Sequence, residues 1–190
     1  MSIRTDMAAE SFSQAGGAKK LKGVKVKNKV IENARLEVTD ITIETQEAAE
    51  KLGRPIGRYI TLTATDSTFD MYSDSFRERA EVIAKAIGEL CGGCERFLAV
   101  GLGNYALTSD AVGPLTAEKI FATRHIKSLA KEIDTDDLGE VTVIQTGVLG
   151  NTGIESSEQV KAIAEHVRPQ AVIAVDALAC SELSNLGRTI

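Results

Sequence analysis

The sequence has no tryptophan and few aromatic residues, cysteines or prolines, and these shortages narrow the classes of protein that it can encode. Its three cysteines are an odd number, which is typical of a reducing compartment rather than of a disulfide framework. No apolar run approaches the roughly 18 residues that a membrane span needs, and the amino terminus lacks the apolar core of a signal peptide. We therefore expect a cytoplasmic protein with no membrane partner.

The charge balance is slightly acidic. The 190 residues include 22 Lys and Arg against 27 Asp and Glu, a net charge of −5, which argues against direct binding of nucleic acid. Hydrophobic residues make up 43% of the chain, enough for a full core. Small, polar and basic residues collect in residues 1–23, so we expect a mobile arm there and a single domain over residues 24–190.

The first half of the chain predicts two strands and two helices, the first of which is short, follows Thr45 and ends at Gly53. Alternating apolar residues predict strands at 34–43, with one bulge, and at 57–63, which together form an antiparallel or mixed extension. A helix is expected from about residue 74, because apolar residues there repeat at steps of three and four. Its predicted buried face consists of Phe76, Ala80, Ile83, Ile87 and Leu90.

The second half alternates between strand and helix. Runs of apolar and β-branched residues at 97–100, 141–146 and 171–175 predict strands, separated by helical patterns at about 112–122 and 157–167. Repeated units of this kind form parallel sheets with right-handed crossovers. The sequence therefore predicts an α/β fold with a mostly parallel central sheet, helices on both of its faces and an N-terminal mixed β extension.

A glycine-containing loop follows the first of these strands. Gly101 and Gly103 allow the backbone to turn sharply, and Asn104 follows them directly. The loop closes at Asp110, just before a helix that Pro114 helps to start. A carboxylate at the positive end of a helix stays ionised, which suits a base or a ligand.

Two further features follow the other predicted parallel strands. Asp176 comes directly after the apolar run AVIAV, and the loop after residue 146 carries Gly150, Thr152, Gly153 and Glu155. Ligands of open α/β sheets bind beyond the carboxyl ends of the strands, so we expect these residues to meet at one edge. Either aspartate, taken alone, is as well explained as a cap of the following helix.

Cofactor motifs are incomplete in this sequence. After Gly101 and Gly103, the third glycine of a dinucleotide fingerprint is replaced by Ala106. Cys91 and Cys94 match half of a zinc site, but no second pair follows, so core thiols are the better interpretation. We expect neither a nucleotide cofactor nor a metal.

Several motifs closely resemble the germination protease family of spore-forming bacteria: RTDMAAE, RPIGRYITL, GLGNYALTSDAVGP, ATRHI, TGVLGNTGIES and AVDALA. The resemblance implies an atypical aspartic endopeptidase that starts the degradation of small acid-soluble, DNA-binding spore proteins during germination. It also implies a zymogen, a tetramer, a location in the forespore and spore core, and a fold near the hydrogenase maturation proteases. By motif, the proposed catalytic aspartates correspond to Asp110 and Asp176.

The resemblance leads to a mechanistic hypothesis with alternatives. A water molecule would be activated between the two aspartates, with Asp110 as the base and Asp176, buried at its strand end, as the acid. A nickel-dependent endopeptidase of the maturation type is one alternative, in which His125 would replace a histidine expected after the second aspartate. Family members continue beyond Ile190, so a truncated relative that only binds or oligomerises is another.

The amino-terminal residues carry one more expectation. The segment RTDMAAE is small and acidic, and a mobile extended segment of this kind fits a protease cleft. In a family made as zymogens, we expect the arm to cover the edge with Asp110 and Asp176 and to be cut within about the first dozen residues.

Overall fold

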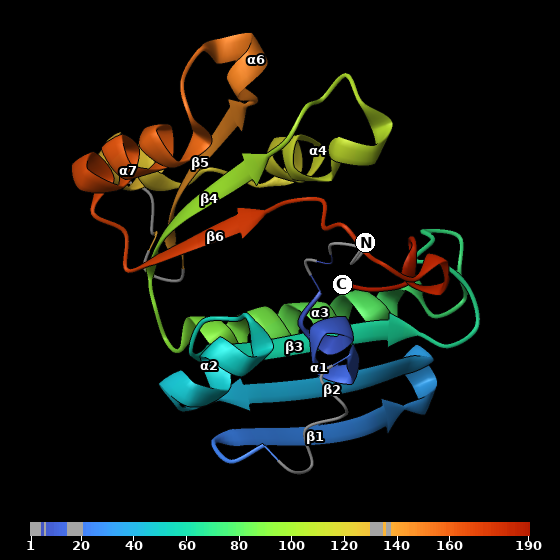
Figure 1. Cartoon of the computed structure of the whole chain (residues 1–190). Coiled ribbons are helices and arrows are strands. Elements are labelled where there is room, and N and C mark those ends of the chain that lie inside the picture. Colours follow the sequence, from blue (N-terminus) through green and yellow to red (C-terminus); the bar gives the residue numbers. More distant parts are fainter. Residues whose placement is uncertain (1–4, 6, 15–20, 130–134, 136–137) are drawn as a thin grey trace. The chain divides into compact units, whose positions relative to one another are not determined.

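The computed structural model describes residues 5, 7–14, 21–129, 135 and 138–190 (Figure 1). Contacts group the chain into two compact units: unit 1 draws on Met1–Leu90 and Leu178–Ile190, and unit 2 on Cys91–Ala177. Unit 2 is thus inserted, in sequence, into unit 1. The division into a mobile arm and a single domain stays a prediction. No helix in the described part of the chain is long and apolar enough to cross a membrane.

Unit 1 is built on an antiparallel sheet. Its strands are β1 (Val24–Ile31), β2 (Leu36–Ile43) and β3 (Gly57–Ala64), in that order. The strand β1 was not predicted, although VKVKNKVI alternates. The predicted bulge in β2 is wrong, because β2 pairs residue for residue with both neighbours over its whole length.

Both faces of β2 are covered by other elements, which explains why its apolar residues suggested a bulge. Ile41 and Ile43 pack with the short helix α2 (Gln46–Leu52) and with Phe12 of helix α1 (Ala8–Gln14). Leu36, of the opposite parity, packs with Val82 of helix α3 (Phe76–Cys91). Apolar residues therefore change from even to odd positions along an unbroken strand.

The helix α3 buries a different face from the one predicted. Phe76 and Leu90 are 50% and 53% exposed, whereas Arg79 is only 1% exposed. The guanidinium of Arg79 donates hydrogen bonds to the carbonyls of Ala34 and Thr68, each 3.1 Å long, and pairs with Asp66. A buried arginine that serves loop carbonyls thus takes the place expected for an apolar stripe.

The helix α1 is attached to the last residues of the chain by Glu10. This side chain is 6% exposed and accepts hydrogen bonds from the backbone N–H of Ser181 (2.8 Å) and from Asn185 Nδ2 (2.6 Å). Burial alone would raise the pKa of Glu10, but hydrogen bonds from Ser181, Thr5 and Asn185 lower this pKa from 4.5 to about 2. Glu10 is therefore a negatively charged anchor inside unit 1.

Replacing Glu10 by glutamine is expected to lower the free energy of unfolding by about 2 kcal/mol at pH 7, because charge-assisted hydrogen bonds are lost. A folded-state pKa below the unfolded value stabilises the protein above that unfolded value. The difference between wild type and Glu10→Gln should therefore shrink as pH falls from 4.5 towards about 2. Chemical denaturation at several pH values measures it, with the exposed Glu37→Gln as control. A difference that does not change with pH would contradict this role.

Unit 2 is an α/β unit around a parallel sheet of order β5-β4-β6. Its strands are β4 (Arg96–Leu102), β5 (Glu140–Gly147) and β6 (Ala171–Val175). The helices are α4 (Val112–Lys119), α5 (Arg124–Leu129), α6 (Leu149–Thr152) and α7 (Ser156–Val167).

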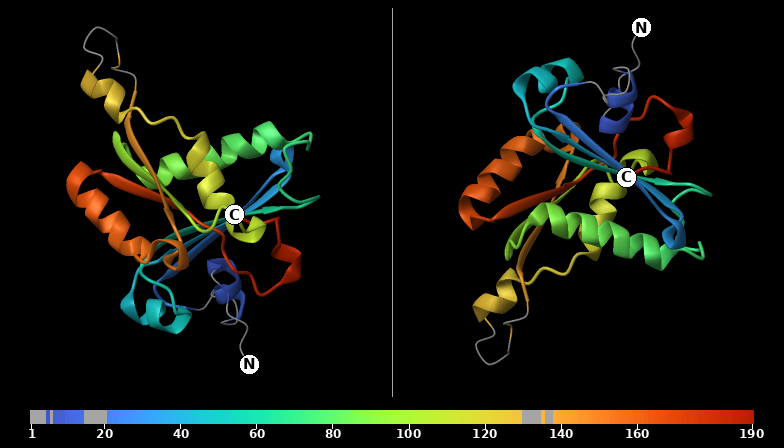
Figure 2. Two further views of the ribbon diagram at one scale, coloured as in Figure 1. Left: turned by 90° about the horizontal axis from the view of Figure 1, so that it is seen from above. Right: turned by 90° about the horizontal axis from the view of Figure 1, so that it is seen from below.

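The order of the strands decides where the crossover helices lie. The chain moves from β4 outward to β5 and then back across β4 to β6. Right-handed crossovers in opposite directions place their helices on opposite faces, and Figure 2 shows α4 and α7 on opposite sides of β4. The predicted α/β fold, with a parallel sheet flanked by helices, is confirmed, and its N-terminal β extension is antiparallel.

Candidate functional site

The carboxyl ends of the three parallel strands meet at one edge of unit 2. Leu102 of β4 pairs with Gly147 of β5, and Gly101 pairs with Val175 of β6. Asp176 follows Val175 and is therefore one position beyond the last paired residue of β6, at the register position next to Leu102. Adjacent strands of a sheet lie only about 4.8 Å apart.

Asp110 closes the loop that leaves β4. The backbone N–H of Asn104 donates a 2.8 Å hydrogen bond to the Asp110 carboxylate, and the Asn104 side chain accepts one from the N–H of Ala106. Gly103 has a φ of 111° and lies so close to Asp110 that a Cβ at this position would be 3.0 Å from Asp110 Oδ1. The loop therefore requires glycine here, as predicted from its sharp turn.

Asp110 does not cap the following helix. It ends a one-turn 3₁₀ segment, Thr108–Asp110, and α4 begins only at Val112, with Ala111 at the N-cap position. The interpretation of Asp110 as a helix cap is wrong. Its carboxylate is half-buried and held by a loop amide, so it stays available at the edge of the sheet.

Gly113 determines how closely this loop approaches the sheet. It is buried, and a Cβ at this position would overlap the backbone oxygens of Leu102 and Val175 and lie 2.6 Å from the Leu102 nitrogen. The start of α4 thus rests directly on the ends of β4 and β6. Asp110 precedes this contact by three residues and Asp176 follows Val175, so both aspartates belong to one corner of unit 2.

The two carboxylates differ in exposure, in the opposite sense to the prediction. Asp176 is exposed and accepts a 2.8 Å hydrogen bond from the N–H of Ala177, whereas Asp110 is half-buried. The prediction that Asp176 is buried at its strand end is therefore wrong, and its role as the acid stays a prediction. A strand end on an edge strand leaves its side chain open to solvent even where the strand itself is apolar.

The loop after β5 leaves from the same edge. Thr152 caps a turn through its hydroxyl, which accepts from the N–H of Ile154 (3.2 Å), and Gly153 ends α6 with a φ of 70°. Glu155 is the N-cap of α7 and forms a capping box with Glu158. A Cβ added at Gly150 would point into open space. The structure thus gives Thr152, Gly153 and Glu155 local roles in shaping the loop, while a contact with substrate stays a prediction.

Both histidines of the sequence lie towards the other end of the sheet. His125 is in the first turn of α5, and Thr123, the residue just before this helix, donates its N–H to the Val141 carbonyl at the start of β5 (3.0 Å). His166 is in the last turn of α7, which leads back to the amino end of β6. A strand of this length spans roughly 20 Å, so neither histidine is placed to join the aspartates.

The cysteine motif shows a simple structural role. Cys91 and Cys94 are half-buried free thiols at the end of α3, where the N–H of Cys94 donates to the Cys91 carbonyl (3.2 Å). Across the residues that the structure describes, no three His, Cys, Asp or Glu side chains gather as a metal site would require.

Unit 2 places the chain in the class of α/β proteins whose candidate site, here with two acidic side chains, lies at the carboxyl edge of a parallel sheet. Family comparison then gives the particular assignment: a family model described as germination protease matches residues 3–190. The chain belongs to the germination protease family. This confirms the resemblance inferred from the motifs.

Similar curated proteins carry the same name. A germination protease of Clostridium perfringens is 36% identical over 99% of this chain and 58% of its own length. Those of Clostridium tetani and Priestia megaterium are 35% and 34% identical over the whole chain, and over 59% and 53% of their own lengths. The chain thus spans little more than half the length of these relatives.

Proposed function

We propose that this chain is part of an endopeptidase that starts the degradation of small acid-soluble, DNA-binding spore proteins during germination. The observation that carries the proposal is the corner of unit 2 where Asp110 and Asp176 flank the contact of Gly113 with Leu102 and Val175. Membership of the germination protease family supports the same reaction class. By the same resemblance, the enzyme is a tetramer made as a zymogen and works in the spore core.

In the proposed mechanism, a water molecule is activated between the two carboxylates. Two carboxylates that share a site cannot both ionise easily, so they hold one proton between them. One carboxylate accepts a proton from the attacking water, and the other donates a proton to the leaving amine. Either carboxylate can take either role, because both flank the same corner of the sheet.

The position of the histidines weighs against the nickel-dependent alternative. That reading needs His125 beside Asp110 and Asp176, but α5 begins next to the amino end of β5. In the proposed mechanism the side chains of this corner supply the acid and the base. The enzyme should therefore cut equally well in the presence of a strong chelator.

A cleavage assay beside a binding assay, on one small acid-soluble spore protein, tests the proposed activity. Intact mass analysis should show discrete internal cuts in the substrate, with and without chelator. Binding without any cut would favour a relative that only binds, and cleavage restored by added nickel would favour the metal-dependent alternative.

Samples at each time point also report trimming of the enzyme itself, which is proposed within about its first dozen residues. Most of residues 1–6 lie outside the described residues.

A further inference from the structure

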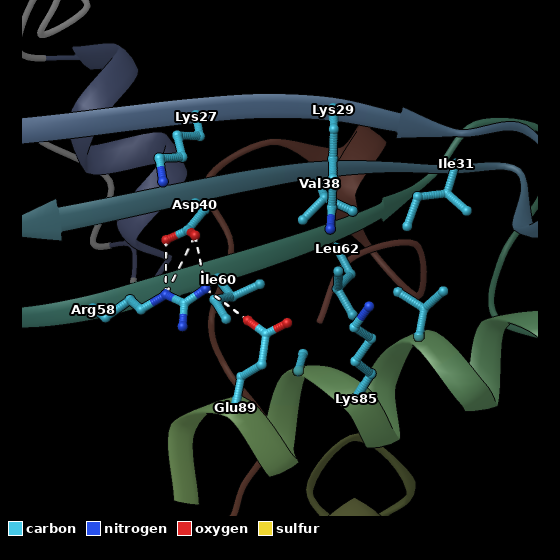
Figure 3. Close-up of a pocket in the computed structure, with 12 residues that line it drawn as sticks. Lys27, Lys29, Ile31, Val38, Asp40, Arg58, Ile60, Leu62, Lys85 and Glu89 are labelled. Atoms are coloured by element: carbon cyan, nitrogen blue, oxygen red, sulfur yellow. Dashed lines mark hydrogen bonds and ion pairs between the residues drawn. The ribbon is translucent and has the colours of Figure 1, made fainter. Parts of the chain in front are cut away.

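A groove in unit 1 has the properties of a binding site and lies apart, in the chain, from the aspartates of unit 2. It opens between α3 and the sheet of β1, β2 and β3 and has a volume of about 340 Å³ (Figure 3). Pockets that hold ligands have volumes of about 300–1,000 Å³. Val38, Leu62 and Val82, one from each of β2, β3 and α3, give it an apolar floor.

The carboxylates of this groove already have a partner. Arg58 forms a 2.9 Å ion pair with Asp40 and another of 2.9 Å with Glu89, which joins the sheet to α3. The hydrogen bond with Arg58 lowers the pKa of Asp40, so this carboxylate stays ionised at neutral pH. Both acidic side chains of the groove therefore pair with the same arginine, Arg58.

Three lysines remain on the walls. Lys27 and Lys29 project from β1, and Lys85 projects from α3 on the opposite side of the floor (Figure 3). In the described part of the chain, none of them forms a direct ion pair with a carboxylate. Lys27 lies across from Asp40 in the ladder, and Lys27 and Lys29 act on that carboxylate only through longer-range attraction. The groove thus contains four cationic and two anionic side chains, a net charge of +2, in a chain whose net charge is −5.

The spacing of the lysines indicates the shape of the ligand. Lys27 and Lys29 are two residues apart on one strand, so their side chains leave the same face roughly 7 Å from each other. Alternate side chains of an extended peptide have the same spacing, and the side chain between them points the other way. A chain of net negative charge is not suited to a nucleic acid, whose affinity depends on many cations.

We propose that this groove binds an extended acidic segment of a partner protein. Carboxylates two residues apart contact Lys27 and Lys29, and the apolar side chain between them points the other way, towards Val82 on α3, where Lys85 closes the opposite wall. Extended segments and apolar anchors are common in peptide recognition, and complementary charge sets the register and the rate of association. The proposal does not depend on the cleavage chemistry, because Asp110 and Asp176 belong to the other unit.

Fluorescence anisotropy tests the proposal with a labelled peptide in which leucine separates two glutamates, using Asp176→Asn protein so that no cleavage interferes. The double substitution Lys29→Glu/Lys85→Glu should weaken binding at least about tenfold, because it places like charges opposite the peptide. Lys22→Glu/Lys161→Glu changes the net charge equally at exposed lysines outside the groove, and it should leave affinity within about twofold.

Three results would overturn the proposal. The first is equal weakening by the two double variants, which would show attraction by net charge alone. The second is undiminished binding of a peptide with glutamines in place of its glutamates, or of a single-stranded oligonucleotide. The third is loss of binding on adding Asp110→Asn, which would place the peptide at the aspartates. All lysines concerned are exposed, so thermal unfolding of the variants should match that of the parent protein.

Discussion

Asp110→Asn and Asp176→Asn are each expected to lower the rate of spore-protein cleavage by about 10²–10⁴-fold, the range typical for loss of a general acid or base. Asparagine keeps the side-chain oxygen that accepts from the Asn104 N–H, a bond of 2.8 Å in the native loop. The loop should therefore keep its shape while the proton-transfer group is lost. Initial rates by mass spectrometry, with unfolding curves for each variant, separate these effects.

Asp70→Asn is a matched control for these substitutions. Asp70 also accepts a backbone hydrogen bond within a turn, from the N–H of Tyr72 at 2.9 Å, but it lies in unit 1. Its replacement should leave the cleavage rate unchanged. If both aspartate variants kept the wild-type rate, the proposed pair would have no catalytic role. If only one lost activity, a mechanism with a single carboxylate would replace it.

Gly113→Ala should be among the most damaging small substitutions in unit 2, lowering the free energy of unfolding by about 3 kcal/mol. The added Cβ would overlap the carbonyl oxygens of Leu102 and Val175, which are fixed in two neighbouring strands. Helix α4 must then move away from the sheet, which separates Asp110 from Asp176. Cleavage should fall together with stability, as measured by chemical denaturation and initial rates.

Gly150→Ala is the corresponding control. A Cβ at Gly150 would have nothing within 4 Å, and the residue lies in the short helix α6. Alanine in a helix is more favourable than glycine by about 0.5–1 kcal/mol, so this variant should be as stable as wild type or slightly more so. Equal damage from both substitutions would mean that the approach of α4 to the strands is not what makes Gly113 necessary.

The parallel unit was predictable because its signals are local and agree with each other. The runs at 97–100 and 171–175 are apolar throughout, as buried parallel strands are. The run at 141–146, VTVIQT, is rich in β-branched residues, which are enriched in strands. The position of Asp110 and Asp176 at one edge then follows from the rule for open α/β sheets. The exposure of Asp176 does not follow from such rules, because it depends on which strand is at the edge of the sheet.

Unit 1 was harder to predict because its buried residues do not follow a single face. Leu36 and Ile41 are both buried, on opposite faces of β2, so their spacing imitates a bulge. Arg79 is buried because it donates to carbonyls of distant residues such as Ala34, 45 positions earlier. Periodicity treats any arginine as a surface residue, and only the tertiary structure shows these acceptors.

The structural roles of Gly113 and Glu10 could not be predicted from the sequence, for two different reasons. Gly113 stands in the motif that carried the family resemblance, but nothing in the sequence tells that its Cα touches two strands. Glu10 is one acidic residue near the amino terminus, and its partners Ser181 and Asn185 come about 170 residues later in the chain.

The insertion of unit 2 into unit 1 has a consequence for the order of folding. Cys91–Ala177 is continuous, so its contacts can form as soon as that segment has been synthesised. Unit 1 is completed only by Leu178–Ile190, through pairs such as Glu10 with Ser181, 171 positions apart, and Leu62 with Ile190. Closing loops of this length is slow, and the loop entropy must be overcome before the contacts contribute. On the ribosome, the unit with the aspartates can therefore fold before residues Leu178–Ile190, which complete unit 1, have been synthesised.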